Sequence, residues 1–240
     1  MSSELAFVLT GAFLASLAAG AAGFADAMIC SAVWLQVLGP AEVVPLLLAT
    51  GLVVHAGPLY RLRHAIRPAR LLPFVVPGLI GVPIGVWLLQ FSDPEPFRAT
   101  MGAFLVAYSL IFLFVSPDAP VVAGGRRADG AVGLVSGVMG GLAGLSGVLP
   151  TIWSGLRGWP RDEQRGVYET FIFVMHGMAL TWLAFAGLVD GAMGQRFLWS
   201  LPAIALGSWL GIGLYRRLDE KLFRRIVLGL LLSAGVALLI

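Results

Sequence analysis

Long apolar runs without charged residues recur along the chain, and short polar segments separate them. A transmembrane helix needs about 20 such residues. Six runs reach or approach that length, and a seventh does so if Leu222 and Phe223 join it: Leu5–Ala25, Leu71–Ser92, Ala99–Pro117, Ala131–Leu156, Thr170–Val189, Phe197–Tyr215 and Ile226–Ile240. The pattern predicts an all-α, polytopic transmembrane helical bundle, and we expect a bacterial inner membrane around it.

Composition strengthens this reading. Hydrophobic residues make up 58% of the chain and charged residues 12%, against about 25% charged in soluble domains. The net charge of +3 does not indicate nucleic acid, because the arginines lie in short loops between spans, as positive-inside bias requires. The single cysteine, Cys30, excludes a Cys-based metal cluster and is expected to be a packing residue. We expect no metal and no cofactor.

The sequence contains two similar halves. The matches, in order, are Gly20 and Gly23 with Gly141 and Gly144, Glu42 with Asp162, Thr50 with Thr170, His55 with His176, Gly81 and Gly85 with Gly207 and Gly211, and Phe97-Arg98 with Phe223-Arg224. We therefore expect a first transmembrane repeat at 1–116, a cytoplasmic linker at 117–130 and a second repeat at 131–240.

The basic residues decide how the repeats are oriented. Eight plain crossings would divide the Lys and Arg residues almost evenly between the two sides of the membrane. If Leu5–Leu38 and Ala131–Leu156 each enter and leave on the same side, 14 of the 16 gather on one side. Positive-inside bias favours the second arrangement. It predicts two inverted repeats, each with a broken or re-entrant helical hairpin plus three transmembrane helices, and both termini outside.

Each predicted hairpin has a glycine-rich break near its centre. The candidate substrate-binding residues there are Gly20, Gly23 and Asp26 in the first half and Gly141, Gly144, Ser146 and Gly147 in the second. A helix that starts inside the membrane points free N–H groups and a positive dipole end at its midplane, which suits an anion. Asp26 and Ser146 stand where N-caps would stand. The alternative is helix packing through small residues, our preferred interpretation for Gly81/Gly85 and Gly207/Gly211.

Polar residues inside spans are costly and usually functional. His55 and His176 occupy matching places and, with Thr50 and Thr170 earlier on the same helices, are predicted to line the pathway; structural hydrogen bonding is the alternative for the histidines. Asp26 would repel an anion unless protonated, so it is the candidate for proton coupling, with a plain N-cap role as the alternative.

We expect structural roles for three further side chains. Glu169 is expected to pair with a loop arginine. Trp34 and Trp153, on the second arms of the hairpins, are expected to anchor at the membrane interface.

At these residues the sequence resembles the TauE/SafE family of sulfite exporters, also called TSUP permeases. The resemblance rests on the breaks Gly20-Ala-Ala-Gly23-Phe-Ala-Asp26 and Gly141-Leu-Ala-Gly144-Leu-Ser146-Gly147, on the helix-borne Thr50 and Thr170, and on the paired Gly-x-x-x-Gly motifs. It implies transport of sulfite, organosulfonates or related sulfur oxyanions. Asp26 departs from the pattern, because a glycine is usual at that position.

These features predict a secondary membrane transporter that exports a small sulfur oxyanion. Coupling of this transport to a proton or another cation is left open. The chain lacks GxxxxGK[ST], HExxH, CxxC and GxSxG motifs, so we expect no enzyme activity. The alternatives are a passive anion channel and a non-transporting membrane assembly subunit. Saturable flux with counterflow would indicate the carrier, and ohmic currents the channel. Direction of transport and oligomeric state stay open, a homodimer included.

Overall fold

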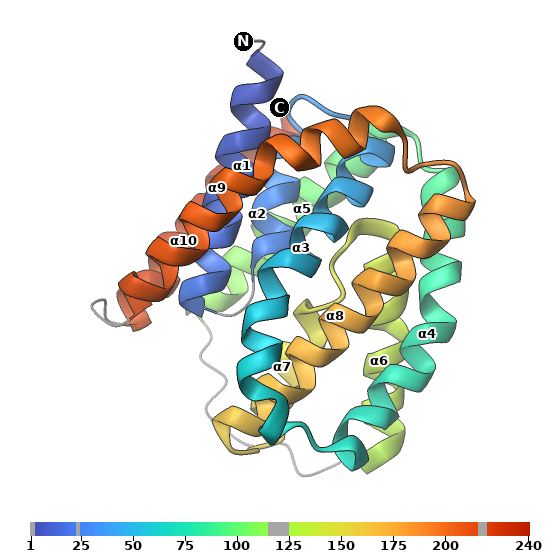
Figure 1. Ribbon diagram of the computed structural model, residues 1–240, viewed down its shortest axis with the longest axis vertical. Helices are drawn as coiled ribbons and strands as arrows, with labels where there is room; N and C mark the ends of the chain where they lie inside the picture. Colours follow the sequence, from blue (N-terminus) through green and yellow to red (C-terminus); the bar gives the residue numbers. More distant parts are fainter. Residues whose placement is uncertain (1–2, 23–24, 115–124, 216–219) are drawn as a thin grey trace. The chain divides into compact units, whose positions relative to one another are not determined.

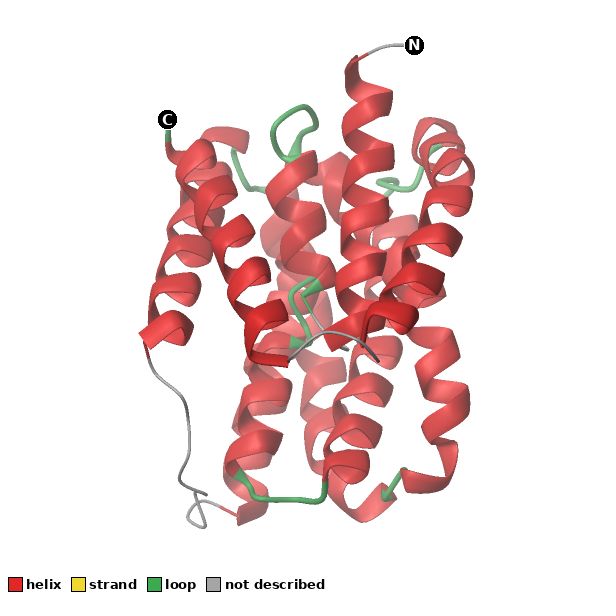
Figure 2. Ribbon diagram, turned by 90° about the vertical axis from the view of Figure 1, so that its left-hand side faces the viewer, coloured by secondary structure: helices red, strands yellow, loops and turns green. Residues whose placement is uncertain are grey.

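The computed structural model describes residues 3–22, 25–114, 125–215 and 220–240. All regular secondary structure in these ranges is helical (Figures 1 and 2). The elements are α1 (Ser3–Ala22), α2 (Asp26–Trp34), α3 (Pro40–Leu62), the 3₁₀ turn η1 (Arg63–Ala65), α4 (Pro68–Gln90), α5 (Pro94–Phe114), α6 (Gly125–Ala143), α7 (Val148–Leu156), α8 (Arg161–Phe185), α9 (Gly191–Tyr215) and α10 (Glu220–Leu239).

The order of helix lengths repeats along the chain. In each half a long helix is followed by a helix of 9 residues and then by three long helices. Among the described residues, five segments are long and apolar enough to cross a membrane, carried by α1, α3 with η1, α4, α5 and α8. The predicted polytopic helical bundle is therefore confirmed. Of the predicted linker, residues 117–124 lie outside the described ranges, and 125–130 form the first turns of α6.

Both short helices fold back along the long helix that precedes them. In the first half, the Trp34 indole donates a hydrogen bond of 3.1 Å to the Val8 carbonyl, so the end of α2 lies beside the first half of α1. In the second half, the Trp153 indole donates one of 2.8 Å to the Asp129 carboxylate near the start of α6. Each pair is thus an antiparallel hairpin whose two ends meet, as the sequence predicted.

The helices group into two compact units. Unit 1 contains residues 1–50, 92–116 and 190–240, and unit 2 contains residues 51–91 and 117–189. Each unit combines helices from both halves of the sequence: α1 packs on α9 and α5 on α10 in unit 1, whereas α4 packs on α6 in unit 2. The hairpin of each half therefore packs on a long helix of the other half.

Glycines make these close helix contacts. A Cβ added at Gly211 of α9 would collide with the Leu17 carbonyl of α1, and one added at Gly85 of α4 would collide with the Val138 carbonyl of α6. Gly81 and Gly207 meet neighbouring backbone in the same way. The prediction that these glycines serve packing is confirmed, and small residues at such contacts are typical of membrane helices.

Basic residues collect at one end of unit 2. Arg67 and Arg70, at the start of α4, pair with Glu163 at the start of α8. Arg157, after α7, lies 3.6 Å from Asp129 in the second turn of α6. These segments fall on the same side only if α6 and α7 form a hairpin, so the geometry of unit 2 agrees with the charge distribution that predicted it.

Candidate functional site

The break between α6 and α7 places backbone and hydroxyl groups inside unit 2. Gly144 has φ of +71°, a conformation that favours glycine, and it ends the first arm of the hairpin. Ser146 is completely buried, and its hydroxyl has no hydrogen-bond partner in the described part of the chain. Gly147 is the N-cap of α7 and no side chain caps that helix, so the N-cap role predicted for Ser146 is wrong. The hydroxyl is left available to a bound group.

His176 of α8 reaches this break. Its Nε2 lies 3.2 Å from the Gly144 carbonyl oxygen, and the side chain is 1% exposed. A carbonyl can only accept a hydrogen bond, so Nε2 carries the proton and donates it. His176 therefore lies beside the second break.

His55 of α3 and Glu169 of α8 form a buried pair next to His176. The distance from His55 Nδ1 to Glu169 Oε2 is 2.6 Å, and the side chains are 1% and 0% exposed. The rings of His55 and His176 are 6.1 Å apart, at 80° to each other. The two histidines that match in the repeat therefore lie together, and a carboxylate accompanies them.

Arg165 extends this row toward the basic end of unit 2. Its Nη2 is 3.6 Å from Glu169 Oε1, and its side chain is 33% exposed. Glu169 thus has an arginine neighbour, as expected, but that arginine belongs to α8, and the shorter contact is with His55. The sequence analysis did not predict His55 as a partner of Glu169. The available signal was the spacing of Glu169 and His176, two turns apart on one helix face.

The remaining predicted residues lie in different surroundings. The Thr170 hydroxyl donates to the Gly166 carbonyl of its own helix, at 2.6 Å. Thr50 is buried on α3 in unit 1, and the structure shows no hydrogen-bond partner for its hydroxyl among the described residues.

Gly141 faces α4 and Gly20 faces α9, where added Cβ atoms would lie 2.8 Å from Val86 N and 3.0 Å from the Ser208 carbonyl oxygen. Packing against these helices explains both glycines, and Gly23 lies outside the described residues.

The break in unit 1 carries Asp26. Its side chain is buried, and it is the first residue of α2. The N-cap is Ala25, with φ of +81°, and no side chain caps the helix, so the predicted N-cap role of Asp26 is wrong.

Trp34 is completely buried, and its hydrogen bond to the Val8 carbonyl holds it inside unit 1. The interface-anchoring role predicted for Trp34 is therefore also wrong.

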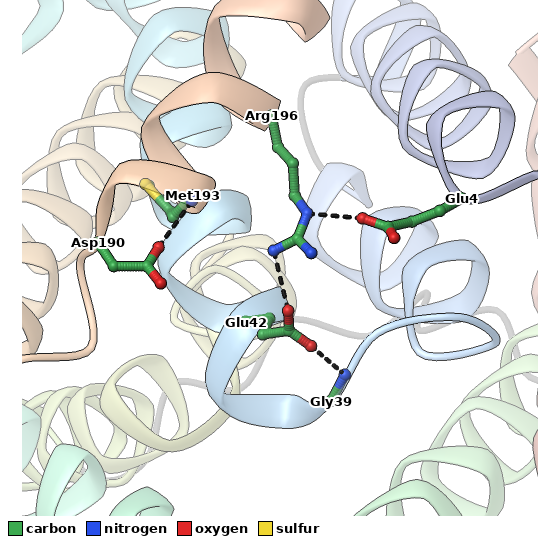
Figure 3. A network of polar contacts seen from close by, with 6 residues as sticks. All are labelled: Glu4, Gly39, Glu42, Asp190, Met193 and Arg196. Carbon is green, nitrogen blue, oxygen red and sulfur yellow. Dashed lines mark hydrogen bonds and ion pairs between the residues drawn. The ribbon is translucent and has the colours of Figure 1, made fainter. Parts of the chain in front are cut away.

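A polar network holds one end of unit 1 together (Figure 3). Arg196, near the start of α9, donates to Glu4 of α1 at 2.8 Å and to Glu42 of α3 at 2.9 Å. The second oxygen of Glu42 accepts a hydrogen bond of 3.0 Å from the Gly39 backbone N–H. One guanidinium thus connects the N-terminal ends of three helices, much as Arg70 binds Glu163 in unit 2.

The family model described as "Sulfite exporter TauE/SafE" matches residues 8–238 of this chain. The chain belongs to the TauE/SafE family. No curated protein and no solved structure matches it. Membership of TauE/SafE, a transporter family, together with the apolar helices, makes the chain a multi-pass membrane protein of a family of sulfur-compound exporters, as the resemblance implied.

Proposed function

We propose that this TauE/SafE protein is a secondary transporter that exports a small sulfur oxyanion, sulfite or an organosulfonate, across a bacterial inner membrane. In this proposal the arginine-rich end of unit 2 faces the cytoplasm, in keeping with positive-inside bias. The family match supports transport of a sulfur compound. The residues at the break between α6 and α7 support an anion as the form that binds.

The buried, unpartnered hydroxyl of Ser146 carries the proposal most directly. An unpaired buried donor is unfavourable unless a ligand or water completes it. The N-terminus of α7 follows immediately, and its free backbone N–H groups and positive dipole end favour an oxyanion. Gly144, Ser146, Gly147 and His176 are the residues we assign to this site. A protonated His176 would add positive charge.

The other predicted residues keep narrower roles. Thr50 remains a candidate substrate ligand through its buried hydroxyl, and Asp26 remains a candidate coupling group in unit 1. Gly23 remains a candidate by its match to Gly144. Thr170, Gly20 and Gly141 are assigned to helix geometry and packing, since their contacts in the structure account for them.

Flux in proteoliposomes tests the function and the site together. Wild-type protein should move labelled sulfite with saturation and counterflow. Ser146→Ala should weaken the apparent affinity about tenfold or more, because a hydrogen bond to a charged group contributes about 1.5–3 kcal/mol. Ser154→Ala is the matched control: Ser154 is also buried, on α7, but its hydroxyl already donates to the Thr151 carbonyl.

Two results would count against this assignment. If both serine variants behave as the wild type does, the anion binds elsewhere. If wild-type vesicles show ohmic anion currents without counterflow, the protein is a channel and not a carrier.

A further inference from the structure

Glu169 is a buried carboxylate with no counterpart in the other repeat. The register that pairs His55 with His176 pairs Glu169 with Leu48, which is also completely buried, on α3. The fold therefore accommodates an aliphatic side chain at this position of the repeat. An ionisable group inside a membrane-spanning helix is costly, so the carboxylate in α8 calls for a role beyond packing.

The geometry of Glu169 and His55 suits the binding and release of a proton. The 2.6 Å distance between Nδ1 and Oε2 is that of a hydrogen bond, so one proton lies between the two atoms and is bonded to one of them. A carboxylate and an imidazole can each bind one proton, so the pair has possible net charges of −1, 0 and +1. Each proton gained makes the surroundings of His176 more positive by one charge, at a ring separation of 6.1 Å.

Several ionisable groups of the elements next to α8 bind other partners or are exposed. Arg70 of α4 pairs with Glu163 at the basic end of unit 2. Asp129 of α6 accepts a hydrogen bond from Trp153 and lies near Arg157 at the same end. The side chains of Arg63 and His64 on η1 are exposed, and α7 has no ionisable residue. Among the described residues, the pair has a charged neighbour in Arg165 and a titratable neighbour in His176, both on α8.

We propose that Glu169 and His55 bind the proton that moves with the anion, and that His176 links this pair to the anion site at the α6–α7 break. The inference rests on the proposed transport function. Arg165 connects the pair to the basic end of unit 2, and the Gly144 carbonyl connects His176 to the break. An added proton near His176 should strengthen anion binding about tenfold or more, and an anion should favour proton uptake by the same factor.

The test compares pH-driven flux with exchange in the same proteoliposomes. Labelled sulfite uptake is measured with and without a pH gradient, and as sulfite–sulfite exchange at equal pH. In Glu169→Gln the ratio of pH-driven flux to exchange should fall at least tenfold, and His55→Gln should show the same loss. Glu163→Gln, which removes a carboxylate from the same helix but at the Arg70 pair, should keep the wild-type ratio.

A binding measurement covers variants that fail to fold. Wild-type protein in weakly buffered detergent should take up about one proton for each methanesulfonate bound, followed with a pH indicator, because methanesulfonate itself does not titrate near neutral pH. Binding without proton uptake would overturn the inference. It would also be overturned if Glu169→Gln kept its acceleration by the pH gradient, or if only Asp26→Asn lost it. A wild type that moves neither sulfite nor methanesulfonate would instead contradict the proposed function.

Discussion

The two breaks share a scaffold and differ in their chemistry. In both units a 9-residue helix follows a residue in the left-handed region, Ala25 in one and Gly144 in the other. In both, a tryptophan on the short helix bonds to the preceding long helix. The packing glycines and the Arg–Glu pairs also occur in both units.

The differences concern ionisable groups. Trp34 bonds to a backbone carbonyl, whereas the matching Trp153 bonds to the carboxylate of Asp129. Unit 2 contains the buried His55–Glu169 pair, and the repeat register puts Leu48 where the second half has Glu169. The comparison teaches that the two halves share the contacts that hold each hairpin, whereas the carboxylates that bond to Trp153 and His55 both belong to the second half of the sequence.

The largest expected effect breaks the shared scaffold. Gly85→Leu in unit 2 and Gly211→Leu in unit 1 should each cost about 3 kcal/mol or more and abolish the monodisperse folded protein, because backbone atoms of the facing helix occupy the space. Size-exclusion chromatography and melting temperature in detergent measure this.

Two exposed helix glycines provide the controls. A Cβ added at Gly57 in unit 2 or Gly229 in unit 1 meets no atom within 4 Å, so leucine there should be tolerated. If Gly211→Leu were tolerated as well while Gly85→Leu was not, the hairpin of unit 1 would not depend on α9 in the way that the α6 hairpin depends on α4.

A smaller effect separates the two left-handed residues. Ala25→Gly should stabilise the protein and Gly144→Ala should destabilise it, each by about 1 kcal/mol, because a Cβ is disfavoured at positive φ. Melting temperature in detergent again measures the change. Gly187→Ala is the reference, since Gly187 has φ of +76° and open space around its Cβ position. A stabilising Gly144→Ala would mean that the second break does not require this backbone conformation.

The periodicity of the sequence predicted most of the fold, and the reason is physical. A bilayer requires apolar runs of fixed length, so the spans and the repeated order of helices can be read from composition. The hairpins followed from the distribution of arginines, because the cost of translocating charge acts on whole loops. The sequence did not predict that each hairpin packs on a long helix of the other half, because the contacts of Gly85 with α6 and of Gly211 with α1 depend on a fit to distant backbone atoms that no local pattern shows.

The candidate site was predicted less completely. His55 and His176 were identified from the repeat, and they lie 6.1 Å apart. Glu169 was assigned to a surface arginine because a charge near a span end normally reaches solvent, whereas it is completely buried against His55. Trp34 was assigned to the interface by its residue type, but its indole finds an acceptor on α1 inside unit 1. In each case a specific partner on another helix, invisible in the sequence pattern, outweighed the average behaviour of the residue type.

The smallest expected effect compares the ion pairs at the helix starts. Arg196 is 18% exposed and binds two carboxylates. Arg70 is 37% exposed and pairs with one carboxylate among the described residues, Glu163, and its guanidinium lies 4.9 Å from the Trp159 ring centroid. Arg196→Gln and Arg70→Gln should each lower the free energy of unfolding by about 1 kcal/mol or less, since partly exposed pairs are screened by solvent.

Salt distinguishes the two pairs. Raising the ionic strength should reduce the loss for Arg196→Gln, which is carried by charge, more than the loss for Arg70→Gln, part of which is the contact with Trp159. Melting temperatures at low and high salt measure this, and the exposed Arg61→Gln provides the baseline for removing a positive charge. Equal salt dependence in the two variants would mean that Trp159 adds nothing to the pair in unit 2. The helix starts of the two units would then be held by the same electrostatic contact, and the units would still differ in the buried His55–Glu169 pair of unit 2 and the buried Asp26 of unit 1.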